Sequence, residues 1–354
     1  MAYTTIDNGE EHFNTILYTG DGSADNDITG VGFAPDWVWA KNRGAADAHW
    51  VLDSTRGATK GLYTNGTAAE NTQNHLISFD SDGFSVGNQA NGLNTSSNNY
   101  VSWNWKCNSG TTSSNSDGDI TATVQANTTA GFSIVTYTGN GNASAQTVGH
   151  GLGAECKVVI AKSRSIGDES WRVFHESASQ SGGGNLFLNG TSGLDTSDPA
   201  RITSTNTTTF TLDGYHSTYD ALNENSATYL AYCFAEKQGY SKMGSYTGNA
   251  NSDGTFVYTG FKPAWVMTKR TDSSQNWAMY DNKRDGINVI DKLLYPNGSD
   301  AEVTTGGSLM VDFLSNGFKW RGTSAISNGS GNHIYMAFAE HPFVSSKGVP
   351  VTAR

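Results

Sequence analysis

Tyr137-Thr138-Gly139-Asn140-Gly141 decides how this 354-residue chain is divided, because the same pattern occurs three times. It stands near the start as Tyr18-Thr19-Gly20-Asp21-Gly22 and returns late as Tyr246-Thr247-Gly248-Asn249. The copies begin 119 and then 109 residues apart. That spacing is the size of one small domain and is far longer than the unit of a solenoid repeat. The sequence therefore predicts three tandem copies of one domain.

Further landmarks follow each copy in the same order. Each has a strand-like stretch that ends in a lysine, then an Asn-Gly pair, and finally an apolar run. The stretches are 32–41, 151–162 and 260–269, the pairs are Asn65-Gly66, Asn189-Gly190 and Asn297-Gly298, and the runs are 101–105, 230–234 and 334–338. Asn and Gly supply the positive φ angles that a two-residue hairpin turn requires. We therefore expect antiparallel hairpins in every copy.

The apolar pattern predicts the fold class. Runs rich in Val, Thr, Tyr, Phe and Trp are separated by turn residues, and Trp37-Val38-Trp39 and Trp103-Asn104-Trp105 show the period of two that strands have. Helical periodicity is scarce, and strands do not alternate with helical segments. The sequence predicts an all-β protein of three tandem β-sandwich domains of the jelly-roll, lectin-like type.

The expected domain boundaries follow from composition. They are an N-terminal arm at 1–12, repeat one at 13–107, a linker at 108–119, repeat two at 120–237, repeat three at 238–341 and a C-terminal tail at 342–354. The linker is almost all Ser, Thr, Asn, Gly and Asp, a composition typical of flexible segments. We therefore expect repeat one to be hinged against a rigid pair formed by repeats two and three.

Bulk composition excludes several classes of partner. Net charge is −11 and no basic cluster stands out, whereas binding to nucleic acid depends on concentrated Lys and Arg. Cys107, Cys156 and Cys233 do not recur at matching repeat positions, which argues against a secreted disulfide scaffold and for a reducing cytoplasm. We find neither a signal-peptide pattern nor an apolar run that is long enough to span a bilayer, so we expect no membrane insertion.

The tryptophan pairs have two interpretations, a sugar-stacking platform or a core. The position of Trp39 holds Ile160 and Met267 in the other copies, and the position of Trp105 holds Phe234 and Phe338. A position that accepts any large apolar side chain is a core position. The comparison favours the core.

Lysines end the same strand in each copy, at Lys41, Lys162 and Lys269. They could clamp an anionic ligand, or each could form a surface ion pair with a nearby acid such as Asp53 or Asp281. Surface ion pairs are common and contribute little stability. We favour the ion pair.

The three copies argue against catalysis. Asp82, Asp213 and Asn316 fill one position before a glycine, and a catalytic carboxylate cannot be exchanged for an amide, whereas a turn residue can. We find no Ser-His-Asp set, zinc spacing or phosphate-binding loop. We therefore expect no enzyme, no cofactor and no catalytic metal. The Asp-rich stretches 21–27 and 117–119 lack the EF-hand spacing, and structural calcium there is left open.

The copies differ most in the segment before the closing strand, at 87–99, 216–227 and 322–333. Variable loops on a fixed scaffold are where binding usually lies, and solvated filler is the alternative. Aromatic faces stack on sugars, while Asp, Arg and His bind hydroxyls. The predicted glycan-binding residues are Tyr215, His216, Tyr219 and Asp220 in repeat two, with Trp320 and Arg321 in repeat three.

Several motifs carry a resemblance to a family. They are the opening Met1-Ala2-Tyr3-Thr4-Thr5-Ile6-Asp7, the repeated Tyr-Thr-Gly-Asn-Gly, the junction at 232–242 and the ending Ser346-Lys347-Gly348-Val349-Pro350. The chain resembles the tandem-repeat virion proteins of marine bacteriophages, which are described as tail-fibre or structural proteins. The resemblance covers nearly the whole chain. It implies a virion surface component and carries over no catalytic residue.

Three functions follow as hypotheses. The first is a non-enzymatic virion surface protein, a tail fibre or receptor-binding component that contacts a host glycan. The alternative is a capsid decoration protein that reinforces the shell, and the absence of a heptad or collagen-like shaft favours it. The third, a glycan depolymerase, is disfavoured because no acid pair persists among the copies. We expect location on the virion surface after assembly in the host cytoplasm, other virion proteins as partners, and a homo-oligomer for which a trimer is one option.

Overall fold

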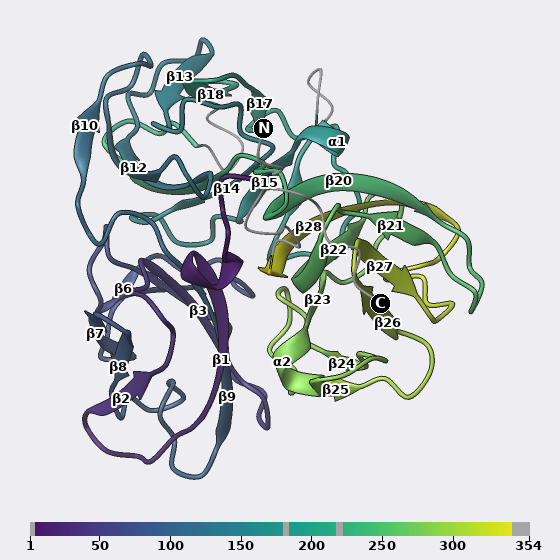
Figure 1. The fold of residues 1–354 in the computed structure, drawn as a ribbon. Helices are drawn as coiled ribbons and strands as arrows, with labels where there is room; N and C mark the ends of the chain where they lie inside the picture. The colour runs from purple at the N-terminus through teal and green to yellow at the C-terminus, as the bar shows by residue number, and fades with distance from the viewer. Residues whose placement is uncertain (1–3, 180–183, 217–221, 342–354) are drawn as a thin grey trace.

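The computed structural model describes residues 4–179, 184–216 and 222–341, and nearly all of its regular structure is antiparallel β-sheet (Figure 1). The prediction of an all-β protein is confirmed. The ribbon divides into three lobes that correspond to the three sequence repeats. The first contains η1 (Gly9–Glu11), β1 (Phe13–Thr19), β2 (Asn26–Thr29), β3 (Trp37–Asn42), β4 (Trp50–Asp53), β5 (Lys60–Tyr63), β6 (Asn71–Thr72), β7 (Leu76–Asp80), β8 (Gly83–Val86) and β9 (Asn99–Trp105).

Repeats two and three contain the remaining elements. Repeat two has β10 (Ser113–Asn115), β11 (Ala122–Asn127), β12 (Phe132–Thr138), β13 (Gln146–Gly149), β14 (Val158–Ser163), β15 (Arg172–His175), α1 (Glu176–Ser179), β16 (Leu186–Phe187), β17 (Ile202–Thr205), β18 (Thr209–Leu212) and β19 (Thr228–Phe234). Repeat three has β20 (Ser241–Gly248), β21 (Phe256–Tyr258), β22 (Lys262–Arg270), β23 (Ala278–Asp281), α2 (Asn282–Asp285), β24 (Lys292–Leu293), β25 (Val303–Thr304), β26 (Val311–Leu314), β27 (Gly317–Trp320) and β28 (Gly331–His341).

The three repeats share one topology. In each, the last strand lies in the middle of a larger sheet, between the strand that carries the Tyr-Thr pattern and the strand that carries the lysine: β1-β9-β3, β12-β19-β14 and β20-β28-β22. A smaller sheet has the orders β2-β8-β7, β13-β18-β17 and β21-β27-β26. In every repeat, buried side chains from both sheets form one core cluster. The internal sequence repeat is therefore a structural repeat.

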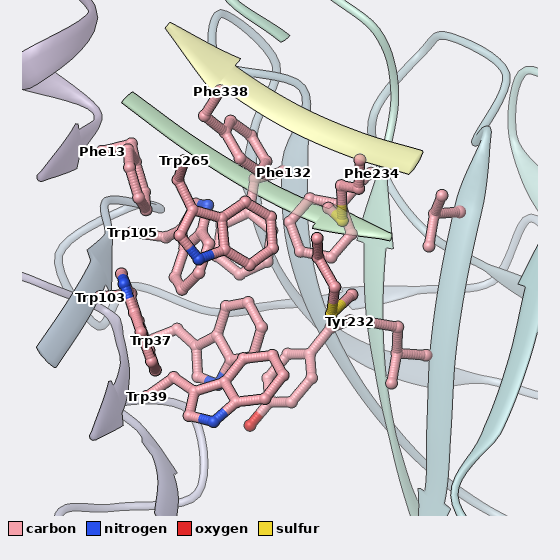
Figure 2. Close-up of a cluster of buried hydrophobic side chains, with 14 of the residues drawn as sticks. Phe13, Trp37, Trp39, Trp103, Trp105, Phe132, Tyr232, Phe234, Trp265 and Phe338 are labelled. Carbon is pink, nitrogen blue, oxygen red and sulfur yellow. The ribbon is translucent and has the colours of Figure 1, made fainter. Parts of the chain in front are cut away.

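The other faces of the three larger sheets meet at the centre of the molecule. Trp37 of repeat one stacks on Tyr232 of repeat two, with ring centroids 4.2 Å apart. Trp105 meets Trp265 of repeat three edge-on at 5.7 Å. Figure 2 shows aromatic side chains of all three repeats converging on this central cluster. The core interpretation of the tryptophan pairs is confirmed.

The central cluster joins the repeats tightly. Trp37, Trp39, Trp103 and Trp105 are all almost fully buried in it. Full burial of a large side chain stabilises by about 3 kcal/mol, so a repeat that swung away would lose on the order of 10 kcal/mol. Free hinging of repeat one is therefore unfavourable.

The segment 108–119, which composition predicts to be a flexible linker, is held in place. It contains β10, which pairs with β11 in the large sheet of repeat two. The carboxylate of Asp36 accepts hydrogen bonds from the N–H groups of Cys107, Ser109 and Gly110. A polar composition shows that a segment lacks apolar side chains, but not whether its backbone groups find partners elsewhere in the chain.

The repeated Tyr-Thr-Gly pattern stands at the end of β1, β12 and β20, where a buried asparagine holds it. The side-chain oxygen of Asn223 accepts the Asn140 N–H at 2.9 Å, and its amide donates back to the Asn140 side chain at 2.9 Å. The same paired contact joins Asn94 to Asp21 and Asn328 to Asn249. A Cβ on Gly139 would lie 2.2 Å from the carbonyl oxygen of Glu224, which explains why the pattern keeps its glycine.

Asp213 does not occupy the turn position that the sequence comparison assigns to it. Phe210 pairs with Val148 in the small sheet, as Phe84 pairs with Ile28, so Phe210 is the equivalent of Phe84. The hairpin turn of repeat two is therefore at 206–208, and Asp213 lies beyond β18. The turn at 206–208 has no glycine, so the sequence comparison instead matched the Asp213-Gly214 pair, which comes later in repeat two, to the turns of the other repeats.

Candidate binding site between repeats two and three

Each repeat presents one strand end to the last strand of another repeat, and the three contacts close a ring. Asp53 at the end of β4 accepts the Tyr232 hydroxyl at 2.8 Å, and Asp281 at the end of β23 accepts the Trp103 indole N–H at 3.0 Å. At the third contact, Nε2 of His175 lies 3.1 Å from the Tyr335 carbonyl oxygen. Head-to-tail contacts of this kind form a ring when the rotation between units closes. We call the three contacts interfaces 1–2, 3–1 and 2–3.

A charged network seals interface 1–2. Arg56 donates to Asp53 at 2.5 Å and to Glu70 at 2.9 Å, and Arg164 of repeat two donates to Glu70 at 2.9 Å. The side chains of Asp53 and Arg56 are fully buried. Burial raises the pKa of Glu70, but the hydrogen bonds from Arg164 and Arg56 outweigh it and leave that pKa below its usual value. Each buried charge thus has a partner, which offsets its desolvation.

Interface 3–1 repeats this network with the same residue types. Arg284 donates to Asp281 at 2.6 Å and to Glu302 at 3.3 Å, and Arg43 of repeat one donates to Glu302 at 2.8 Å. The side chains of Asp281 and Arg284 are again fully buried. The order Asp, Arg, Glu and Arg is therefore a shared feature of two interfaces.

Interface 2–3 keeps the backbone geometry but loses the charges. The Leu194 N–H donates to the Thr271 carbonyl oxygen at 2.7 Å, as Glu70 does to Arg164 and Glu302 does to Arg43, each at 2.8 Å. The four network positions hold His175, Ala178, Leu194 and Thr271. Burial lowers the pKa of His175 to about 4, so this residue is neutral at physiological pH. Two arginines and a glutamate are thus replaced by shorter, uncharged side chains.

The shorter side chains leave a cavity of about 620 Å³ at this interface. It lies between α1, β20, the end of β22 and the start of β28. Its polar lining comes from Ser177, Ser245, Thr247, Thr271, Asp272, Asn332 and His333, and its apolar lining from Ala178, Leu194, Tyr246 and Ile334. The sealed interfaces place long charged side chains at the equivalents of Ala178, Leu194 and Thr271.

The polar groups of the cavity are fixed by neighbours. Asp272 accepts from Arg270 Nε at 2.6 Å and from the Asn332 N–H at 3.0 Å. Burial raises the pKa of Asp272, but these hydrogen bonds outweigh it and the pKa lies below its usual value. His333 is buried and stacks on Tyr246 with centroids 4.9 Å apart, and burial lowers its pKa. The cavity therefore presents hydroxyl and amide groups, one anion and a neutral imidazole over an apolar floor.

The lysines near the ends of β3, β14 and β22 are neither an anion clamp nor surface ion pairs, and both interpretations are wrong. Lys41, Lys162 and Lys269 are fully buried, and each ammonium donates to backbone carbonyl oxygens. Lys162 reaches Thr67 of repeat one at 3.2 Å, and Lys269 reaches Thr191 of repeat two at 3.0 Å. Burial lowers the pKa of Lys41 and of Lys269 to about 8. Lys162 and Lys269 therefore join neighbouring repeats, whereas Lys41 donates to Asn42 and Ala45 within repeat one.

Those predicted glycan-binding residues that the structure describes do not come together in one site. Tyr215 and His216 are half-buried after β18, and the Tyr215 N–H donates to Asn142 at 2.8 Å. Trp320 is fully buried in the core of repeat three, so its ring is not available to a ligand, and Arg321 pairs with Asp312 at 2.5 Å. Tyr219 and Asp220 lie outside the described residues. The sequence comparison placed Trp320 beside the variable loop of repeat three with its ring free for a ligand, whereas Trp320 ends β27 and is buried.

Sequence reasoning missed the cavity at interface 2–3. The signal was a joint change at the four network positions. Interfaces 1–2 and 3–1 hold Asp, Arg, Glu and Arg at these positions, whereas interface 2–3 holds His, Ala, Leu and Thr. Glu70, Leu194 and Glu302 each stand five residues after the asparagine of the Asn-Gly pair, so the sequence aligns them, but it does not show that they meet another repeat. Each change alone is an ordinary substitution between repeats.

Over the described ranges, no cluster of three His, Cys, Asp or Glu side chains is placed to hold a metal ion. The described helices are also too short and polar to cross a membrane. Fold and site define an all-β protein of three two-sheet repeats that close a ring and leave one interface open. The chain belongs to the family described as Domain of unknown function (DUF7483), which matches residues 8–342 and so spans all three repeats. No curated protein and no solved structure matches the chain.

Proposed function

We propose that the protein is a non-enzymatic surface protein of a bacteriophage virion, a tail-fibre or receptor-binding component whose cavity at interface 2–3 binds a glycan of the host surface. One observation carries the binding part of this proposal. Two of three equivalent interfaces are sealed by charged networks, while the third is a cavity of about 620 Å³. The virion part is supported by the sequence resemblance.

The lining suits a sugar better than other small ligands. A sugar ring has hydroxyl groups at its edge and C–H groups on its faces, so it needs several hydrogen-bonding partners beside an apolar surface. The hydrogen-bonding partners are Ser245, Thr247, Thr271 and Asn332, and the apolar surface is formed by Leu194 with its apolar neighbours. In this proposal the two-sheet repeats are jelly-roll, lectin-like domains, and copies of the chain associate on the virion surface after assembly in the host cytoplasm.

A cavity-filling variant tests the site. Thr271→Arg introduces the residue that the sealed interfaces carry there, and Thr207→Arg adds the same charge at an exposed turn as a matched control. The purified protein is expected to compete with phage for host cells and to bind host polysaccharide. We expect Thr271→Arg to weaken both at least tenfold without lowering the melting temperature, and Thr207→Arg to change neither. Wild-type binding by Thr271→Arg would exclude this cavity as the receptor site.

Gold-labelled antibody on intact particles tests the virion part separately. Label at the tail supports a receptor-binding role, and label over the head would instead favour the capsid decoration role. Particles without label would refute the virion assignment, whatever the glycan result.

A further inference from the structure

β21 in repeat three is an edge strand whose outward backbone groups are unpaired. It has β27 as its sheet neighbour on one side. Trp320 donates to the Thr255 carbonyl and Thr259 donates to the Asn316 carbonyl, which fixes the ladder pattern. Because hydrogen-bonded pairs alternate along an antiparallel ladder, the N–H and C=O groups of Phe256 and Tyr258 point away from β27. Among the described residues, no group outside the sheet hydrogen-bonds to them.

The side chains at this edge are also unusual among the three repeats. Phe256 is 44% exposed and Tyr258 is 58% exposed. By sheet register, the equivalent positions hold Asp27 and Thr29 in repeat one, and Thr147 and Gly149 in repeat two. Exposed edge strands are normally protected by charged or covering residues. Repeat three instead presents two aromatic rings beside free backbone groups.

Repeat two shows what occupies such an edge. There the outward N–H of Thr147 donates to the Asp119 carboxylate at 3.0 Å, and the outward C=O of Thr147 accepts the Ile120 N–H at 3.0 Å. Ile120 runs parallel to Val148 and buries its side chain in the core of the repeat. The occupant is thus an extended segment in which an acidic residue precedes an apolar one.

The same segment continues into β11, which closes the seam between the two sheets of repeat two. A Cβ on Gly151 would meet Val124 of β11 at 3.0 Å. The equivalent glycine in repeat three is Gly260, and it lines an open cavity of about 400 Å³ between β20 and the end of β21. Glu236, Lys242 and Tyr258 also line this cavity. The short junction between repeats two and three supplies no strand like β11, so no described strand covers this seam.

We propose that this seam binds an extended segment of another polypeptide, which adds to β21 as residues 117–127 add to repeat two. The partner supplies an acidic residue that accepts the Phe256 N–H. Its next residue donates its N–H to the Phe256 carbonyl and places an apolar side chain in the seam. Main-chain hydrogen bonds give affinity in such strand addition, and side-chain pockets give specificity. This inference does not depend on the glycan proposal.

A peptide with the sequence of residues 113–127 is the probe, because its own site in repeat two is already filled. We expect saturable binding of the fluorescent peptide to the full-length protein and slower amide exchange over 254–260. Phe256→Asp/Tyr258→Thr, which introduces the residues of repeat one, should weaken binding at least tenfold. A peptide carrying Ile120→Asp should fail to bind. Lys242→Glu, on the far side of the seam, provides a second variant should the double variant not fold.

Three results would overturn the proposal. One is a lack of binding by the wild-type protein, and another is binding that neither Phe256→Asp/Tyr258→Thr nor Lys242→Glu weakens. The third concerns the chain's own residues 342–354. If a chain that ends at His341 binds the peptide and the full-length chain does not, the C-terminal segment is the occupant and no partner is needed.

Discussion

Replacing Tyr232 with Phe tests whether the three repeats unfold as one unit. The Tyr232 hydroxyl donates to the buried Asp53 carboxylate across interface 1–2 at 2.8 Å. Phe keeps the ring that stacks on Trp37, so the central cluster is preserved. The same hydroxyl accepts a longer bond from Arg56 at 3.3 Å, so the cost is dominated by the bond to the buried carboxylate, which is about 1.5–3 kcal/mol. We take about 2 kcal/mol as the expected loss in the free energy of unfolding.

The shift in melting temperature depends on how many residues unfold together. At about 2.1 cal/mol/K per residue, a unit of about 330 residues has an unfolding entropy of about 0.7 kcal/mol/K, so the shift is about 3 °C. If repeat two unfolded alone, its entropy would be about one third as large and the shift would be about 8 °C. The size of the shift therefore reports the size of the cooperative unit.

Differential scanning calorimetry provides the measurement. We expect one transition that moves down by about 3 °C as a whole. Tyr137→Phe is the matched control, because it removes a neutral hydrogen bond to the Leu222 carbonyl inside repeat two, which costs about 1 kcal/mol. It should move the same single transition by about half as much. Separate transitions of which only one responds would refute the closed ring as a cooperative unit.

Further predictions concern buried ionisable groups and the segment after repeat one. Burial lowers the pKa of Lys269 from 10.5 to about 8, so the unfolded chain keeps this proton to higher pH than the folded chain does. The free energy of unfolding of the wild-type protein should therefore rise between pH 8 and 10.5, by up to about 3 kcal/mol relative to Lys269→Met. A difference between the two proteins that does not change with pH would contradict this. The pKa of His175 is lowered by burial from 6.5 to about 4, so the wild-type protein should lose stability as pH falls through that range. Over the same pH range, the His175→Asn variant should lose up to about 3 kcal/mol less free energy of unfolding than the wild-type protein, as measured by denaturant titration. Equal pH dependence in the two proteins would speak against the burial argument. Limited proteolysis should spare residues 108–119, since Asp36 and β11 hold their backbone, and a first cut there would show that the segment opens.

Features that depend on neighbouring residues could be predicted from the sequence. The period of two in Trp37-Val38-Trp39 and the Asn-Gly turns are local, and they indicated an all-β chain. The internal comparison was itself a form of alignment, and it identified the tryptophan positions as core because Ile160 and Met267 replace Trp39. It failed at Asp213, where the true turn of repeat two has no glycine.

The ring and its open interface were decided by the tertiary structure. Asp53 meets Tyr232 and Trp103 meets Asp281 over separations of 179 and 178 residues, and no local pattern encodes such contacts. Burial of lysine in particular contradicts composition-based expectation, because folding supplies each ammonium with backbone carbonyl oxygens, and at Lys162 and Lys269 one of them comes from another repeat. The cavity arises in the same way. Leu194 and Thr271 read as ordinary residues along the chain, and they leave a cavity because folding places them where the other interfaces hold Glu and Arg.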